Sequence, residues 1–153
     1  MPAQTTVGLA WQAAPATLVA VDLKHIGWSG VMESFRMRYD SAGMGGSVSF
    51  AMTQRWKDQT VLQLGAAQRL NDTWTLRAGA NLAGNPVPDA FVNPIFPAIV
   101  KNHYTLGAGL AMAPGRDLNL SMAYAPTVSV DTPSGVVVSH RQLNLQLMLS
   151  QRF

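Results

Sequence analysis

The last eleven residues, 143–153, read LNLQLMLSQRF and decide the fold. One side of an extended chain carries the apolar residues Leu143, Leu145, Leu147, Leu149 and Phe153, and the alternating positions are mostly polar: Asn144, Gln146, Ser150 and Arg152. A β-strand has a period of two residues, so this segment has one apolar and one polar face. Because about ten residues suffice for a tilted strand to cross a bilayer, we predict the closing strand of an outer-membrane β-barrel.

The composition fits this prediction. Charged residues make up 12% of the 153-residue chain and hydrophobic residues 48%, whereas a typical soluble domain has roughly 25% charged residues. Few charges without excess hydrophobicity suit a barrel with a lipid-facing outside and a polar, uncharged lining. A soluble β-sandwich with an uncharged surface and a binding function fits the composition as well.

Several other classes of protein lack support in the sequence. The net charge is +3, but the basic residues are scattered. They form no run or stripe that could follow the phosphate backbone of a nucleic acid. There is no cysteine, and His25, His103 and His140 have no metal-ligand spacing. No nucleophile elbow and no phosphate-binding loop is present. We therefore expect no enzyme activity, no metal site and no cofactor.

The remaining sequence reads as strands punctuated by turns. Alternating apolar residues predict about seven long strands, near 7–12, 19–39, 47–69, 74–82, 104–112, 118–124 and 143–153. The second strand is expected to kink near Gly27–Gly30, and the third to break near Trp56–Asp58. A break over 54–58 raises the count to eight or nine strands, and eight strands could close by themselves.

The connections alternate in length. Short turns are predicted at 13–16, 71–72 and 114–117, and long loops near 41–46, 85–102 and 126–136. Short turns at one end and long loops at the other are typical of outer-membrane barrels. Aromatic residues near strand ends fit the interfacial girdles of such barrels, or alternatively an ordinary core: Trp11, Trp74, Tyr104, Tyr124 and Phe153.

Seven strands do not close a barrel of the usual even number, and an open sheet in lipid leaves unpaired edges. We therefore expect residues 1–153 to be part of a larger barrel. The start, Met1–Gln4, lacks the basic and apolar regions of a signal peptide. We expect that such a signal was removed or that the chain begins inside a longer protein.

Several segments together resemble the FadL/TodX-type outer-membrane transporters of hydrophobic compounds. The resemblance is carried in chain order by 7–10 (VGLA), 28–29 (WS), 56–58 (WKD), 64–66 (LGA), 70–72 (LND), 74–79 (WTLRAG), 85–89 (NPVPD), 96–100 (FPAIV) and 102–109 (NHYTLGAG). It spans nearly the whole chain. One departure is Gln151, at a position where an apolar or aromatic residue is usual.

The resemblance implies an all-β fold, an antiparallel transmembrane barrel of 14 strands with an N-terminal hatch. Residues 1–153 would form the C-terminal half, without the hatch and the first strands. It implies uptake of long-chain fatty acids or aromatic hydrocarbons across the bacterial outer membrane, by loop capture and passage through a plugged barrel. The implied partners are these compounds, outer-membrane lipid and lipopolysaccharide, and the barrel-assembly machinery through Phe153. A general porin or structural barrel is the alternative.

Two groups of residues are candidate ligand sites. Arg36, Arg38 and Arg77 lie on the polar faces of their predicted strands, where they could meet a carboxylate or hold the hatch, or simply line a hydrated pore. In the loop 85–100, apolar residues such as Phe91, Ile95 and Phe96 are candidates for a binding surface. They could equally pack against neighbouring loops.

Overall fold

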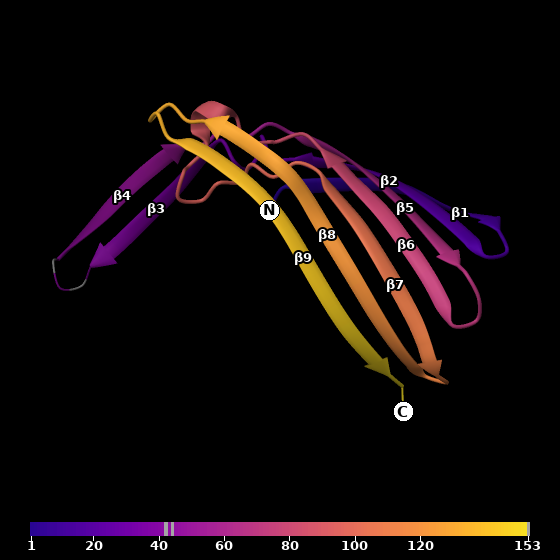
Figure 1. Cartoon of the computed structure of the whole chain (residues 1–153). Coiled ribbons are helices and arrows are strands. Elements are labelled where there is room, and N and C mark those ends of the chain that lie inside the picture. Colours follow the sequence, from indigo (N-terminus) through magenta and orange to yellow (C-terminus); the bar gives the residue numbers. More distant parts are fainter. Residues whose placement is uncertain (42, 44, 153) are drawn as a thin grey trace.

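The computed structural model describes residues 1–41, 43 and 45–152. Seven strands form one antiparallel sheet, in the order β1-β2-β5-β6-β7-β8-β9 (Figure 1). Their bounds are Ala3–Ala14 (β1), Thr17–Gly27 (β2), Gln59–Arg69 (β5), Trp74–Ala83 (β6), His103–Ala113 (β7), Arg116–Asp131 (β8) and Val137–Gln151 (β9). This confirms the all-β fold. The described residues form nine strands, because the predicted strands 19–39 and 47–69 are each divided in two. Among the described residues, β1 and β9 each pair with one neighbour, so the sheet stays open.

One face of the sheet, which we call the outer face, is apolar and exposed. A single register row crosses all seven strands through Leu9, Val21, Leu64, Ala80, Tyr104, Tyr124 and Leu143. Directly paired residues lie on the same face, and Leu9 is 68% and Leu143 60% exposed. A soluble sandwich would cover such a face with a second sheet. No second sheet covers this face within the described part of the chain.

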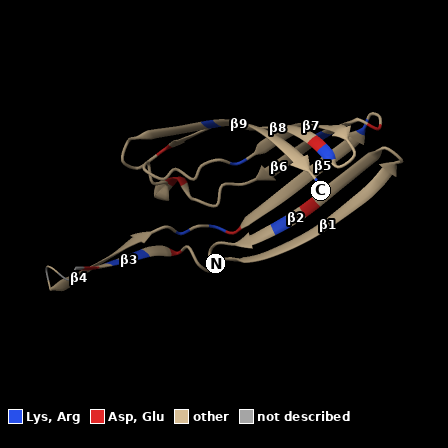
Figure 2. Cartoon of the chain, turned by 90° about the horizontal axis from the view of Figure 1, so that it is seen from below, with Lys and Arg blue, Asp and Glu red and all other residues tan. Residues whose placement is uncertain are grey.

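The opposite face, the inner face, is polar and holds most of the charges in the strands. One row runs through Gly8, Asp22, Gln63, Asn81 and His103. The ionisable residues Asp22, Lys24, Arg69, Arg77 and Asp117 all lie on this face, as their register shows. Figure 2 shows how sparse such residues are on the strands. Five of the eight charged residues in the seven strands thus lie on the inner face. A polar face opposite an exposed apolar one is the pattern of a barrel with lipid outside and water inside.

Polar residues bound the apolar outer face at both ends. At the turn end, which carries the short connections 70–73 and 114–115, Arg116 pairs with Gln151 on the outer face. Arg116 Nη2 donates a hydrogen bond to Gln151 Oε1 (3.2 Å). Gln151, which departs from the apolar or aromatic residue usual at this position, therefore has a hydrogen-bond partner on the neighbouring strand. At the opposite, loop end, the outer-face positions include His25 and Arg141.

Two further strands form a separate hairpin at the loop end. β3 (Ser34–Ser41) pairs with β4 (Gly46–Thr53) as a two-stranded sheet that projects from the main sheet (Figure 1). The expectation that 35–39 continues the second strand was therefore wrong. Trp28 accepts hydrogen bonds from the backbone N–H groups of Val31 and Met32, and this turn breaks the strand. The expected break at 54–58 is confirmed, and residues 42 and 44 of the predicted loop 41–46 lie outside the described residues.

The last of the three predicted long loops, 126–136, is much shorter in the structure. β8 continues to Asp131 and β9 begins at Val137, so only 132–136 connect them. A bulge between Ala125 and Val128 contains Pro126. Pro lacks a backbone N–H, and a bulge is a place where a strand tolerates that loss. The pairing with β7 has already ended at Tyr124, so the missing donor costs nothing on that side.

The buried core is small and sits at the loop end. It consists of Val87, Val92, Ile99 and Val130, with Trp56, Val128 and Val138 packed against it. Val128, Val130 and Val138 belong to the inner face of β8 and β9. The loop 84–102 is thus fixed over the inner face rather than projecting freely. No helix within residues 1–41, 43 and 45–152 is long and apolar enough to cross a membrane.

Candidate functional site

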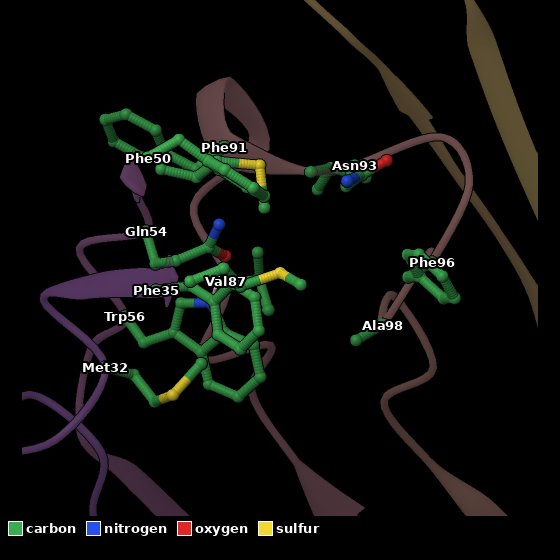
Figure 3. A pocket seen from close by; sticks show the side chains of 13 residues that line it. Met32, Phe35, Phe50, Gln54, Trp56, Val87, Phe91, Asn93, Phe96 and Ala98 are labelled. Atoms are coloured by element: carbon green, nitrogen blue, oxygen red, sulfur yellow. Dashed lines mark hydrogen bonds between the residues drawn. The ribbon is translucent and has the colours of Figure 1, made fainter. Parts of the chain in front are cut away.

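An apolar pocket of about 540 Å³ lies at the loop end, between the β3–β4 hairpin and the loop 84–102 (Figure 3). The hairpin and the segment after it supply one wall, and the loop supplies the other. The lining residues are Met32, Phe35, Met37, Phe50, Met52, Gln54, Trp56, Val87, Phe91, Val92, Asn93, Phe96 and Ala98. None of them carries a charge. The pocket can therefore desolvate an apolar molecule but offers no ion pair.

The hairpin wall follows from strand alternation. Phe35 pairs with Met52 and Met37 with Phe50, so four apolar side chains share one face of β3–β4. All four are between 38% and 47% exposed. A two-stranded ribbon cannot bury an apolar face by itself, so in this structure that face borders the pocket.

The chain reverses its course directly after the hairpin. The backbone N–H groups of Gln54 and Arg55 both donate to Glu33 O, at 3.0 and 3.1 Å, and Arg55 has a positive φ of 46°. A non-glycine residue in this region carries backbone strain, which is frequent at functional sites. The turn brings Gln54 and Trp56 into the pocket wall. Trp56 also makes an edge-to-face contact with Trp28, with ring centroids 5.1 Å apart.

The loop wall is held from behind by the core. Ile99 is 0% exposed, and Val87 and Val92 are buried beside it. Two further bonds tie the loop to the base of the hairpin: Lys57 N–H donates to Pro86 O (2.8 Å), and Gln59 Nε2 donates to Gly84 O (2.7 Å). The two walls are thus joined at their base, and the pocket is built into the fold.

A short 3-10 helix, η1 (Asp89–Phe91), carries an aromatic side chain of the loop wall. The Arg55 guanidinium lies over the Phe91 ring, 5.8 Å from its centroid, which is the range of a cation–π contact. Arg55 comes from the hairpin side and Phe91 from the loop side. This contact therefore holds the walls together while the cation stays outside the pocket lining.

The structure brings together only part of the predicted apolar set. Phe91 and Phe96 line the pocket, whereas Ile95 does not, although Phe96 and Ile95 are adjacent and equally exposed at 77% and 78%. Sequence reasoning missed Phe50, Gln54 and Trp56. The alternation of Val48, Phe50 and Met52 could have revealed the hairpin face, but its position opposite the loop 84–102 depends on tertiary structure.

The three predicted arginines do not line the apolar pocket. Arg36 and Arg38 lie on the face of β3 opposite Phe35 and Met37, and Arg38 Nε donates to Asp40 Oδ1 (2.9 Å). Both border a separate shallow hollow of about 340 Å³ on the hairpin. They are therefore not on the seven-stranded sheet.

Arg77 is on the inner face of the main sheet, towards the turn end. Its Nη1 donates to Asn119 Oδ1 (3.3 Å), and its guanidinium lies over Gly109. A Cβ at Gly109 would come within 2.9 Å of Nη1, so the glycine makes room for the arginine. Arg77 borders a polar hollow of about 220 Å³ with Arg69 and Asp117. The register places it with the polar lining that the sequence predicted.

One acidic residue stabilises the base of the hairpin. Asp58 Oδ1 accepts a hydrogen bond from the Ser29 backbone N–H (2.9 Å). Hydrogen bonds from Ser29, first from its backbone and then from its side chain, lower the pKa of Asp58 below its ordinary value, with a smaller effect of the nearby His25. His25 Nε2 is 4.0 Å from Asp58 Oδ2. Deprotonated Asp58 therefore fixes the turn that positions the hairpin wall.

The fold and the pocket together define a class of protein: a transmembrane β-sheet with lipid-facing and water-facing sides and an apolar pocket among its loops. The model of the family described as outer membrane protein transport protein (OMPP1/FadL/TodX) matches residues 1–146. The chain belongs to this family. Among curated proteins there is no significant match.

Solved structures of the same kind match the whole chain. The toluene transporter TodX of Pseudomonas putida is 31% identical with a TM-score of 0.82, and 100% of this chain aligns with 35% of that chain. The toluene transporter TbuX of Ralstonia pickettii is 25% identical with a TM-score of 0.76, and 100% of this chain aligns with 34% of that chain. A TodX monoaromatic hydrocarbon channel mutant, deltaS2, is 32% identical with a TM-score of 0.85, and 100% of this chain aligns with 36% of that chain. The chain thus spans about a third of the length of these structures.

Proposed function

We propose that this chain is part of an outer-membrane channel that takes up hydrophobic compounds, and that the pocket between the β3–β4 hairpin and the loop 84–102 captures them. The observation that carries the proposal is the uncharged apolar pocket at the loop end of a sheet with a lipid-facing side. Long loops of outer-membrane barrels face the outside of the cell. The pocket would then be the first apolar surface that an incoming molecule meets.

The expected affinity suits capture followed by release. Burial of about seven carbons at roughly 0.8 kcal/mol each contributes about 5 kcal/mol, which corresponds to a dissociation constant on the order of 0.1 mM. Binding of this strength concentrates a hydrocarbon at the pocket without trapping it. Because none of the lining residues is charged, we propose monoaromatic hydrocarbons as ligands ahead of fatty acids. The similar structures described as toluene transporters support this choice.

The architecture of the whole barrel is part of the same proposal. We infer that residues 1–153 form the C-terminal portion of a larger barrel, in which further strands pair with the open edges of β1 and β9. The match to about a third of each similar chain supports this inference. We propose that loop capture is followed by passage through a plugged barrel, in the bacterial outer membrane with its lipopolysaccharide. The assembly signal proposed for Phe153 lies outside the described residues.

A matched pair of variants tests the pocket. Phe96 and Ile95 are adjacent and equally exposed, but only Phe96 lines the pocket. We expect Phe96→Ser to weaken toluene binding by about fivefold and to slow its uptake into proteoliposomes, because the substitution removes roughly 1 kcal/mol of apolar contact. Ile95→Ser should leave both unchanged, and decanoate should bind more weakly than toluene.

Two results would count against this proposal. If the unaltered protein neither binds toluene nor admits it into proteoliposomes, the pocket is not a capture site. If planar bilayers instead show large, steady ion currents, the general porin alternative is correct, because the loop 84–102 does not then restrict the pore.

A further inference from the structure

The apolar pocket contains two polar side chains, and they come from opposite walls. Gln54 belongs to the hairpin wall and Asn93 to the loop wall. Each is partly buried. A polar group at an apolar site fixes the orientation of a ligand, so the way in which each amide group points determines what the pocket recognises.

The orientation of the Gln54 amide is fixed by its neighbour. Trp56 Nε1–H donates a hydrogen bond to Gln54 Oε1 (3.2 Å). An indole nitrogen can only donate, so the atom facing it must be the oxygen. The Gln54 amide nitrogen therefore points towards the open space between the walls, as Figure 3 shows. Within the described part of the chain, no hydrogen bond of Gln54 Nε2 is observed.

The Asn93 amide is fixed in the same way. The backbone N–H of Ile95 donates to Asn93 Oδ1 (2.9 Å). A backbone N–H is also a donor only, so the oxygen is again occupied within the protein. The Asn93 nitrogen faces the side of the cavity where Gln54 lies (Figure 3). The two walls thus present two NH₂ donors, while their amide oxygens are engaged.

The other lining side chains supply no oxygen or nitrogen acceptor for these donors. The other lining residues are aliphatic, aromatic or methionine side chains. The guanidinium of Arg55, the residue after Gln54, lies over the Phe91 ring and outside the lining. A carboxylate that enters the pocket would lose its hydration without gaining a positively charged partner, which is costly. A ligand that carries only hydrogen-bond donors would leave both amide NH₂ groups without an acceptor.

We propose that Gln54 and Asn93 select uncharged apolar molecules that carry a hydrogen-bond acceptor, with a carbonyl oxygen as the best partner and an aromatic ring face as the weaker one. This rests on the proposed function of the pocket as a capture site. An amide N–H donates to a carbonyl oxygen with ordinary strength and to a ring face weakly. Saturated hydrocarbons of the same size gain apolar burial but nothing from the two amides.

The probes are acetophenone and ethylbenzene, which share one skeleton and differ by a carbonyl oxygen. Binding to the protein in detergent micelles is measured for both by headspace equilibrium. The comparison uses the ratio of dissociation constants between variant and unaltered protein for each probe, so the probe's own preference for detergent cancels. We expect Gln54→Met to weaken acetophenone binding by about two- to tenfold and ethylbenzene binding by less than twofold.

Two isosteric variants guard against a distorted pocket. Gln54→Glu and Asn93→Asp each keep the oxygen that accepts from Trp56 Nε1 or Ile95 N–H, and replace the donating NH₂ by an oxygen. Both should weaken acetophenone binding more than ethylbenzene binding. Gln12→Met is the matched control, because Gln12 lies near the turn end of β1 and should affect neither probe.

The outcomes separate the two levels of the proposal. Selective loss of acetophenone binding in the Gln54 and Asn93 variants supports donor recognition. Equal losses for both probes, or no change in either, overturn it while leaving the capture site intact. If the unaltered protein binds neither probe, the proposed function itself fails, and the roles of Gln54 and Asn93 fail with it.

Discussion

Leu147 offers the clearest test of which face of the sheet meets lipid and which meets water. This residue lies on the outer face of β9, opposite Leu120, and is 68% exposed. Gln146 is its neighbour on the inner face, opposite Ser121. We expect Leu147→Arg to impair insertion and stability in a bilayer, and Gln146→Arg to be tolerated, because adjacent residues of one strand face lipid and water.

The magnitude follows from the depth of Leu147. It stands four residues before Gln151, which marks the polar boundary at the turn end. At about 3.3 Å per residue and a tilt of roughly 40°, this places it on the order of 10 Å below the boundary of an apolar band about 25 Å tall. An arginine near the bilayer midplane of a barrel costs about 2–4 kcal/mol. The same arginine on the inner face should cost less than about 1 kcal/mol.

The assay is equilibrium unfolding in urea of protein folded into phosphatidylcholine vesicles, with folding followed by the gel mobility of the unheated sample. Leu147→Arg should lower the free energy of unfolding by the stated amount or prevent insertion. Equal effects of the two substitutions, or a larger effect of Gln146→Arg, would refute the assignment of the outer face to lipid.

The remaining predictions concern the loop end. Ile99→Ala should destabilise the packed loop by about 2–5 kcal/mol and speed proteolysis within 84–102, because Ile99 is fully buried; Ile95→Ala serves as the exposed control and should have almost no effect. The pKa of Asp58 is lower in the folded state than in the unfolded chain, so its stabilising effect is present at neutral pH and lost as the pH falls below about 4 through the folded-state pKa. The protection of the Ser29 amide against hydrogen exchange should therefore fall in this acidic range. In Asp58→Asn this acid-dependent step should disappear, and an unchanged pH profile would contradict the role of the carboxylate.

Much of the sheet could be predicted from alternation alone. Segments such as 74–82 and 143–149 repeat apolar and polar residues with a period of two, and the register confirms that each set shares one face. The turn near Asn71 was also readable, because its Oδ1 accepts from the backbone N–H groups of Thr73 and Trp74. These features are local, so the sequence contains all the information they need.

The pocket could not be predicted in the same way. Phe35 and Met37 alternate as regularly as the residues of a membrane strand, and periodicity cannot distinguish a strand that faces lipid from one that faces a loop. Only the turn at 28–33 and the pairing with β4 show that they belong to a separate hairpin. The continuation of β8 past Pro126 was also not predicted, because proline usually ends a strand. Here a bulge accommodates the proline and the strand continues.

The sequence by itself determined the fold class, the strand faces and the family resemblance, because these depend on side-chain alternation and short motifs along the chain. Tertiary structure decided which apolar residues face lipid and which enclose the pocket. It also decided that Phe96 lines the pocket while Ile95 does not, and that the amide oxygens of Gln54 and Asn93 are occupied. The physical reason is that a binding site depends on distances between segments far apart in the chain, which local periodicity does not contain.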